Sequence, residues 1–304
     1  MHKLYDEDRL PECQPIIQTS NVKDLLTFTY LLTDPERLYS TIGVVTAWSG
    51  EGKTIASLFC QRAIERHFQS VLPTTIRVKV EPRSTAKDLA TNVLGELGER
   101  SKGDNRTRLT ADAASGIERN DARLLIYDEG DGLTDDSFEV VRYLVDKTGC
   151  PALVVGLPSI MRVINRQEKF DGRAYLRMSF KSLSLEEVLT VVLPGLVFPR
   201  WSFDPNDETD RVMGEALWRK VRPNLRKLRG ILDTANISAK AKGEARITLP
   251  LINDVYARFM SVEEQYHYNK QSRTDAQEQQ GPLEQKSVER HEAKDAKRKN
   301  KTND

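Results

Sequence analysis

A short polar segment near residue 50 places two glycines, a lysine and a threonine directly after an apolar run. The apolar run covers residues 42–47, and the chain then reads Trp48-Ser49-Gly50-Glu51-Gly52-Lys53-Thr54. An apolar-periodic stretch from Ile55 to Phe68 follows, so the predicted order is strand, loop and helix. Glycines let such a loop fold back so that its N–H groups face an anion, and the helix adds its positive N-terminal end. This order predicts a phosphate-binding P-loop, with a chance Gly-Lys-Thr turn as the alternative.

The residue types of this loop predict how a nucleoside triphosphate is held. Lys53 would reach the β- and γ-phosphates, and the Thr54 hydroxyl would ligate Mg²⁺. The backbone groups expected around the phosphates belong to Ser49, Gly50, Glu51, Gly52, Lys53, Thr54 and Ile55. Ala47 replaces the first glycine of G-x-x-x-x-G-K-[ST], a small change because that position ends the strand. We therefore predict ATP and Mg²⁺ as ligands.

A second apolar run ends in two adjacent carboxylates. Residues 123–127 read as a buried strand, and Asp128 and Glu129 follow at its end. Asp128 would hold Mg²⁺ directly or through water, and Glu129 would polarise a water for attack on the γ-phosphate. The alternative is an ordinary acidic turn after a strand. The position of Asp128 and Glu129 after a P-loop favours an ATP hydrolysis site.

Composition limits the class of protein. Lys plus Arg is 46 and Asp plus Glu is 45 in 304 residues, so any nucleic-acid surface must be local rather than a property of the whole chain. No apolar run approaches a membrane span, and the charged N-terminus is not a secretory signal. Cys13, Cys60 and Cys150 lack metal-type spacing and are typical of reduced thiols. We expect a cytoplasmic protein without membrane contact.

The order of predicted elements indicates an α/β fold. Strands are expected at 42–47, 75–80, 123–128, 151–157 and 175–180, with helices between them, including one over 158–168 and one capped by Asn21. A basic loop is expected over 98–110. Alternating strands and helices predict a parallel five-stranded sheet in a three-layer αβα core. The expected domains are an arm (1–20), this core (21–182), a helical lid (183–264) opened by a Ser184–Glu187 capping box, and a charged, disordered tail (265–304).

Several stretches resemble the AAA+ ATPases that regulate transposition, the MuB/TnsC/TniB group. The resemblance covers roughly residues 40–190 and is carried by the runs Leu124-Leu125-Ile126-Tyr127-Asp128-Glu129-Gly130-Asp131-Gly132-Leu133, Phe138-Glu139-Val140-Val141-Arg142-Tyr143-Leu144-Val145-Asp146-Lys147-Thr148-Gly149, Ala152-Leu153-Val154-Val155-Gly156-Leu157-Pro158, Phe170-Asp171-Gly172-Arg173 and Phe180-Lys181-Ser182-Leu183-Ser184-Leu185-Glu186-Glu187. It implies a P-loop AAA+ core followed by a small helical lid. Gly130 and Gly132 depart from the usual Ala and Arg, and Leu157 stands where many AAA+ proteins carry a polar sensor.

The resemblance also implies roles for three arginines. Arg173 falls at the position of the arginine finger, which completes the ATP site of a neighbouring subunit. Arg226, in Asn224-Leu225-Arg226, falls at the lid sensor that touches nucleotide within its own subunit, and Arg229 is an alternative. A finger acting in trans implies a head-to-tail homo-oligomer, either a ring or a helical filament.

The same resemblance implies a sequence-independent contact with double-stranded DNA. The implied DNA-binding residues lie after the second strand and in the next loop: Lys87, Lys102, Asn105, Arg106 and Thr107. Each could equally be an exposed solubilising side chain. Repetition along a filament would add up weak contacts to the phosphate backbone.

The sequence therefore favours an ATP-dependent AAA+ regulator of transposition with slow, switch-like ATPase activity. It would assemble on target DNA, recruit a transposase together with a target-selection protein, and disassemble on hydrolysis. A replication-type AAA+ initiator or helicase loader is the first alternative. An ATP-dependent scaffold or signalling module that binds only proteins is the second, and the neutral net charge favours it mildly.

Overall fold

The computed structural model describes residues 16–37, 41–68, 74–101, 103–166, 168–222 and 224–259. Most of the predicted arm, Cys13, Lys102 and the predicted tail lie outside these residues. The chain forms two compact units, Met1–Asp233 and Thr234–Asp304. The expected boundary between core and lid at residue 183 stays a prediction.

Five parallel strands form one sheet in the order β2-β3-β4-β1-β5. The strands are β1 (Ile42–Thr46), β2 (Thr75–Lys79), β3 (Leu124–Asp128), β4 (Ala152–Gly156) and β5 (Leu176–Ser179). Every residue of β1, β3 and β4 is buried, as expected for strands covered on both faces. The predicted five-stranded parallel sheet is confirmed.

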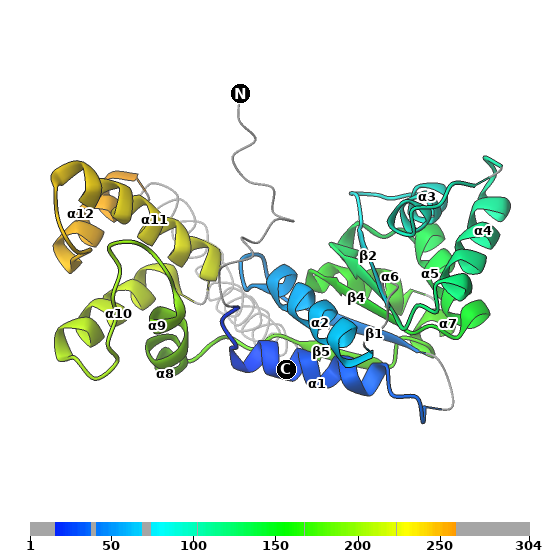
Figure 1. Ribbon diagram of the computed structural model, residues 1–304, viewed down its shortest axis with the longest axis horizontal. Coiled ribbons are helices and arrows are strands. Elements are labelled where there is room, and N and C mark those ends of the chain that lie inside the picture. The colour runs from blue at the N-terminus through cyan, green and yellow to red at the C-terminus, as the bar shows by residue number, and fades with distance from the viewer. Residues whose placement is uncertain are drawn as a thin grey trace, which may run out of the picture. The chain divides into compact units, whose positions relative to one another are not determined.

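Helices cover both faces of the sheet (Figure 1). On one face, α1 (Ser20–Leu32) and α2 (Lys53–Phe68) pack on alternate strand residues such as Leu124 and Ile126. On the other face, α3 (Ala86–Glu96), α4 (Arg106–Arg119) and α5 (Asp135–Thr148) pack on the intervening residues, including Leu125 and Tyr127. Side chains that alternate along each strand thus feed two separate cores, which confirms the three-layer α/β architecture.

The remaining elements of the described chain are helical. They are the 3-10 turns η1 (Gly130–Gly132) and η2 (Pro158–Ile160), then α6 (Met161–Asn165), α7 (Glu168–Asp171), α8 (Leu185–Glu187), the π-helical η3 (Val188–Val192), α9 (Leu193–Gly195), α10 (Glu208–Val221), α11 (Leu225–Lys242) and α12 (Leu249–Phe259). No helix in the described ranges is long and apolar enough to cross a membrane.

Four local expectations were wrong. The helix expected over 158–168 is broken into η2, α6 and α7, and the break brings Phe170 against Phe138 at a ring-centroid distance of 4.7 Å. Thr19, not Asn21, caps α1, because the buried Asn21 amide instead pairs with both backbone groups of Lys181.

The third wrong expectation concerns Ser184, which caps α8 without a reciprocal bond. The Glu187 carboxylate binds Ser20 instead. The fourth concerns the basic loop over 98–110, because α4 already begins at Arg106 with Asn105 as its N-cap. Asn105 followed by the apolar spacing of Leu109 and Ala113 is a helix-start signal. The basic residues around it favoured the prediction of a loop instead.

Two cysteine thiols are buried inside the core, Cys60 on α2 and Cys150 just before β4. Burial raises the pKa of Cys60 from its ordinary 9.0 to about 11, against the opposite effect of a hydrogen bond with Thr29. Burial raises the pKa of Cys150 as well. Both thiols are therefore protonated and inert at neutral pH.

Native protein is predicted to resist alkylation at both buried cysteines. A pKa of about 11 in place of 9.0 lowers the thiolate fraction of Cys60 about 100-fold at pH 8, and burial blocks the access of the reagent to the sulfur. Between pH 9.0 and about 11 the Cys60 thiol ionises in the unfolded chain but not in the folded protein. The stability that comes from burying the protonated thiol is therefore full below pH 9.0 and is lost as the pH rises towards about 11. Iodoacetamide labelling read by mass spectrometry checks this, and rapid labelling of folded Cys60 at pH 8 would contradict it.

Candidate nucleotide site

The loop between β1 and α2 has the backbone geometry that an anion site needs. Gly50 and Gly52 both adopt positive φ, 83° and 87°, which side chains disfavour. The Glu51 carboxylate accepts the Trp48 N–H at 2.8 Å, while the Glu51 N–H donates to the Trp48 carbonyl at 3.3 Å. The loop is thus closed by Glu51 itself. Sequence reasoning assigned only the backbone of this residue.

Ala47 belongs to the sheet rather than to the loop. It is buried, and its N–H donates to the carbonyl of Gly156 at 3.0 Å, which extends the pairing of β1 with β4. A methyl group at this position does not enter the phosphate cradle. The replacement of the first motif glycine therefore leaves the loop intact.

Lys53 is the first residue of α2 and is only 8% exposed. Within the described part of the chain, its ammonium group has no carboxylate partner and no hydrogen bond. A buried, unpaired cation is costly unless an anion compensates it. Its place at a helix N-terminus, beside glycines of positive φ, fits a bound phosphate group.

Asp128 lies at the same edge of the sheet as this loop. It ends β3 opposite Val155 of β4, and Val155 lies opposite Val45, one residue before the end of β1. The side chain is buried, and its Oδ1 accepts the N–H of Glu129 at 2.9 Å. Among the described residues no group of three or more His, Cys, Asp or Glu side chains could hold a metal alone. Mg²⁺ held by the predicted pair, Thr54 and Asp128, would have to take its other ligands from phosphates and water.

Arg77 of β2 was missed by sequence reasoning. Its guanidinium Nη2 lies 2.6 Å from the Asp128 Oδ2, and the two side chains are 11% and 2% exposed. The signal in the sequence was a polar residue facing inward within the alternating strand 75–79. The metal-binding carboxylate predicted here therefore already carries a positive partner.

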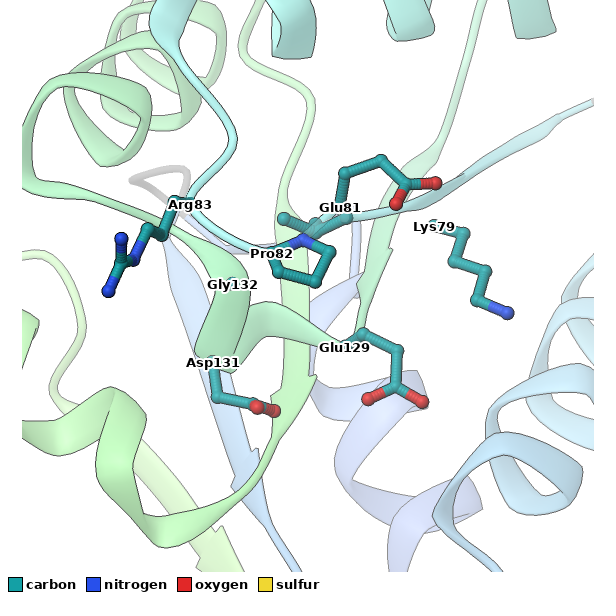
Figure 2. A pocket seen from close by; sticks show the side chains of 8 residues that line it. Lys79, Glu81, Pro82, Arg83, Glu129, Asp131 and Gly132 are labelled. Atoms are coloured by element: carbon teal, nitrogen blue, oxygen red, sulfur yellow. The ribbon is translucent and has the colours of Figure 1, made fainter.

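Glu129 follows Asp128 in a left-handed conformation, φ 57°, and opens onto a cavity of about 310 Å³. Figure 2 shows side chains from the end of β2 and from the turn after β3 around this cavity. The residues that line the cavity are Lys79, Val80, Glu81, Pro82, Arg83, Glu129, Asp131 and Gly132. The cavity leaves room for a water molecule beside the Glu129 carboxylate.

Close backbone contacts require a glycine at position 132. A Cβ there would lie 2.5 Å from the Glu81 carbonyl oxygen, so no side chain fits. The neighbouring Asp131 accepts the Leu157 N–H at 2.9 Å and ties the turn after β3 to the end of β4. Leu157 therefore contributes its backbone, not a polar side chain, at the expected sensor position.

A segment near the start of α11 contacts the P-loop from outside. Asn224 Nδ2 donates to the Ser49 carbonyl at 3.2 Å, and its Oδ1 accepts the Lys227 N–H at 2.9 Å. The Arg226 N–H donates to the Gly50 carbonyl at 3.2 Å. A Cβ added at Gly50 would collide with the Asn224 amide. Asn224 thus bridges loop and helix, a role that the sequence did not reveal.

Comparison with known proteins places this architecture. A family model described as an AAA domain matches residues 37–164. The fold is the AAA+ P-loop fold. No curated protein sequence matches the chain.

Solved structures share this AAA+ fold at low identity. The ORC2 protein of Aeropyrum pernix, solved with ADPNP and ADP, has a TM-score of 0.64 and 14% identity, covering 84% of this chain and 71% of that chain. The ORC1 protein of the same organism, in complex with DNA, has a TM-score of 0.61 and 15% identity, covering 82% and 67%. Domain III of the replication initiation protein DnaA of Thermotoga maritima has a TM-score of 0.56 and 11% identity, covering 81% and 95%. The finer resemblance to transposition regulators stays a prediction.

The predicted arginine finger, Arg173, lies at the opposite edge of the sheet from the P-loop. The Arg173 carbonyl accepts the N–H of Ile42, the first residue of β1, at 3.1 Å. Five strand residues separate this edge from the P-loop by about 16 Å. The Arg173 guanidinium pairs with Asp146 at 2.6 Å, while Asp171 pairs with Arg177. Arg173 is therefore remote from the P-loop of its own subunit.

Two of the regions predicted to contact DNA meet on the surface. Lys87, in the first turn of α3, pairs with Asp104 at 2.7 Å, and Asp104 leads into the N-terminus of α4. Arg106 and Thr107 are exposed in the first turn of α4. The Asn105 side chain is occupied as the α4 cap, accepting the Arg108 N–H. The DNA-binding role of these residues stays a prediction.

Proposed function

We propose that this AAA+ protein is an ATP-driven assembly switch that acts on double-stranded DNA. The observation that carries the proposal is Lys53, a buried cation without a partner in the described chain, at the start of a helix and beside a loop with two positive-φ glycines. Only an anion completes that site. The adjoining Thr54, Asp128 and Glu129 supply what hydrolysis of the terminal phosphate needs.

Each side chain would have one task in converting ATP and water to ADP and phosphate. The loop amides and Lys53 would bind and orient the phosphates, and Thr54 and Asp128 would hold Mg²⁺. When bound, Mg²⁺ neutralises phosphate charge. Glu129, facing the cavity, would accept a proton from the attacking water. Arg226 would contact nucleotide from the lid.

Arg173 would act on the site of a neighbouring subunit. It lies at the sheet edge away from its own P-loop, so its guanidinium would stabilise the transferring phosphoryl group only at the site of another copy. A head-to-tail interface of this kind makes a ring or a helical filament. ATP would therefore link subunits, and hydrolysis would release them.

DNA contact would come from the exposed region around Lys87, Arg106 and Thr107. The ORC1 protein of Aeropyrum pernix, which shares the fold, was solved in complex with DNA. Contacts to phosphates need no base reading and gain strength by repetition along an assembly. Lys102 and Asn105 would belong to the same region.

The proposed biological role is to regulate transposition by presenting DNA to a transposase, together with a target-selection protein. The sequence runs 124–133, 138–149 and 152–158 support this role. A replication-type initiator or helicase loader is the second candidate, favoured by the similarity to domain III of DnaA, 95% of which is covered. A transposase partner supports the first role, and a helicase partner supports the second.

The test uses the full chain, a random-sequence duplex and ATP, ADP or no nucleotide. Electron microscopy and sedimentation are expected to show assemblies on DNA only with ATP, as filaments for the first role or as rings for the second. Absence of both assembly and DNA retention with ATP would refute the proposal. Assembly on partner protein but never on duplex would indicate a scaffold instead.

Removal of two basic side chains should weaken DNA binding without affecting nucleotide binding. In the double variant Lys87→Ala, Arg106→Ala, the plot of log binding constant against log salt should become less steep. The magnitude of its slope should drop by about 0.9 for each phosphate that a subunit no longer neutralises. Fluorescence anisotropy at several salt concentrations measures it. Arg123→Ala, which removes an exposed charge near the N-terminal end of β3, is the matched control and should leave the slope unchanged. An unchanged slope in the double variant would contradict this interface.

A further inference from the structure

A buried arginine lies against the carboxylate predicted to bind Mg²⁺. In the sheet register, Arg77 of β2 lies opposite Ile126, and Asp128 follows two residues later on the same face of β3. The Arg77 Nη2 and the Asp128 Oδ2 are 2.6 Å apart, and at 11% and 2% exposure the pair is almost free of solvent. This is the face on which α2, the helix of the P-loop, packs.

Both oxygens of Asp128 are occupied by protein donors. Oδ2 accepts from Arg77, and Oδ1 accepts the N–H of Glu129 at 2.9 Å. The arginine supplies a full positive charge where a bound metal would otherwise supply it. A buried charge without a partner is strongly unfavourable, so the guanidinium compensates the Asp128 carboxylate in the absence of metal.

We propose that Arg77 is the resident counter-ion of Asp128 and competes with Mg²⁺ for it. Without nucleotide, Arg77 and the Glu129 N–H hold the carboxylate in place. When Mg²⁺ and nucleotide bind, two positive groups share one carboxylate, so the metal binds more weakly than it would without Arg77. The switch would then respond to Mg²⁺ concentration. This inference rests on the proposed nucleotide site.

The first measurement uses neither metal nor nucleotide, so it does not depend on the proposed function. Arg77→Gln removes the charge, and unfolding in EDTA should shift Tm down by about 6 to 12 °C. Asp128→Asn should shift it similarly, and the double variant should lose less than the sum of the two. Arg123→Gln is the matched control, because that pair with Asp121 is 47% and 72% exposed and should move Tm by about 2 °C or less.

The second measurement separates competition with metal from a merely structural pair. Mg²⁺ is titrated against the full chain in the presence of a fluorescent ADP analogue. Arg77→Gln should lower the half-saturating Mg²⁺ concentration about tenfold. Arg77→Lys, which keeps the charge, should stay near wild type. Adding Mg²⁺ and ADP should raise the Tm of Arg77→Gln more than that of wild type, because the metal then replaces the missing charge.

Each outcome is decisive for Arg77. A lowered Tm with unchanged Mg²⁺ half-saturation would overturn the inference and leave a structural ion pair. If Arg77→Gln does not fold in EDTA, it is prepared in Mg²⁺ and ADP, where the inference requires it to fold, and failure there overturns it too. If wild type binds no nucleotide at any Mg²⁺ concentration, the proposed function fails, while the EDTA measurement still reports on the pair.

Discussion

Lys53→Ala is expected to abolish nucleotide binding and every ATP-dependent assembly on DNA. The ammonium group is buried and has no partner in the described residues, so a bound phosphate would be its counter-ion. Loss of one member of a buried charge pair weakens binding about 30-fold or more. Calorimetric titration with ADP measures the affinity, and sedimentation with plasmid measures assembly.

The matched control is Lys147→Ala, an exposed lysine in the last turn of α5. It removes the same charge at the other end of the core and should leave both measurements unchanged. Because removing the buried Lys53 charge also relieves a cost, Lys53→Ala should fold at least as well as wild type without nucleotide. Coating of plasmid by Lys53→Ala in the absence of nucleotide would overturn the proposed switch.

The second large effect is expected from mixing two inactive variants. Glu129→Gln should bind ATP but not hydrolyse it, because the amide cannot accept a proton from water. Arg173→Ala should keep its own site but lack the group that serves a neighbour. In an equal mixture about a quarter of the interfaces pair an intact Glu129 with an intact Arg173, so about a quarter of wild-type turnover should return.

Phosphate release measured across mixing ratios checks this complementation, and a maximum near equal proportions is expected. The control is Arg173→Ala alone at the same total protein concentration. If turnover of the mixture equals the sum of the separate variants, Arg173 does not act between subunits. Its ion pair with Asp146 would then be its whole role.

Periodicity and motif spacing were sufficient to predict the core. Strand residues such as Leu124 to Tyr127 are apolar on both faces, and this pattern, alternating with helices, has one stable arrangement, the covered parallel sheet. Gly50, Gly52 and Lys53 lie within four consecutive positions, so their chemistry is local and can be predicted from the sequence. Errors arose where a contact with a distant segment overrode a local signal, as at Asn21, whose cap signal lost to a pairing with Lys181 160 residues away.

Contacts between distant segments were decided only by the tertiary structure. Arg77 and Asp128 are 51 positions apart and meet because β2 and β3 are neighbours in the sheet. Asn224 reaches Ser49 across 175 positions, and Gly132 is required by the approach of the Glu81 carbonyl. No spacing rule encodes such pairs, since each depends on the strand order and on how loops pack. The sequence by itself determined the phosphate-binding chemistry, and the fold decided which side chains restrain it.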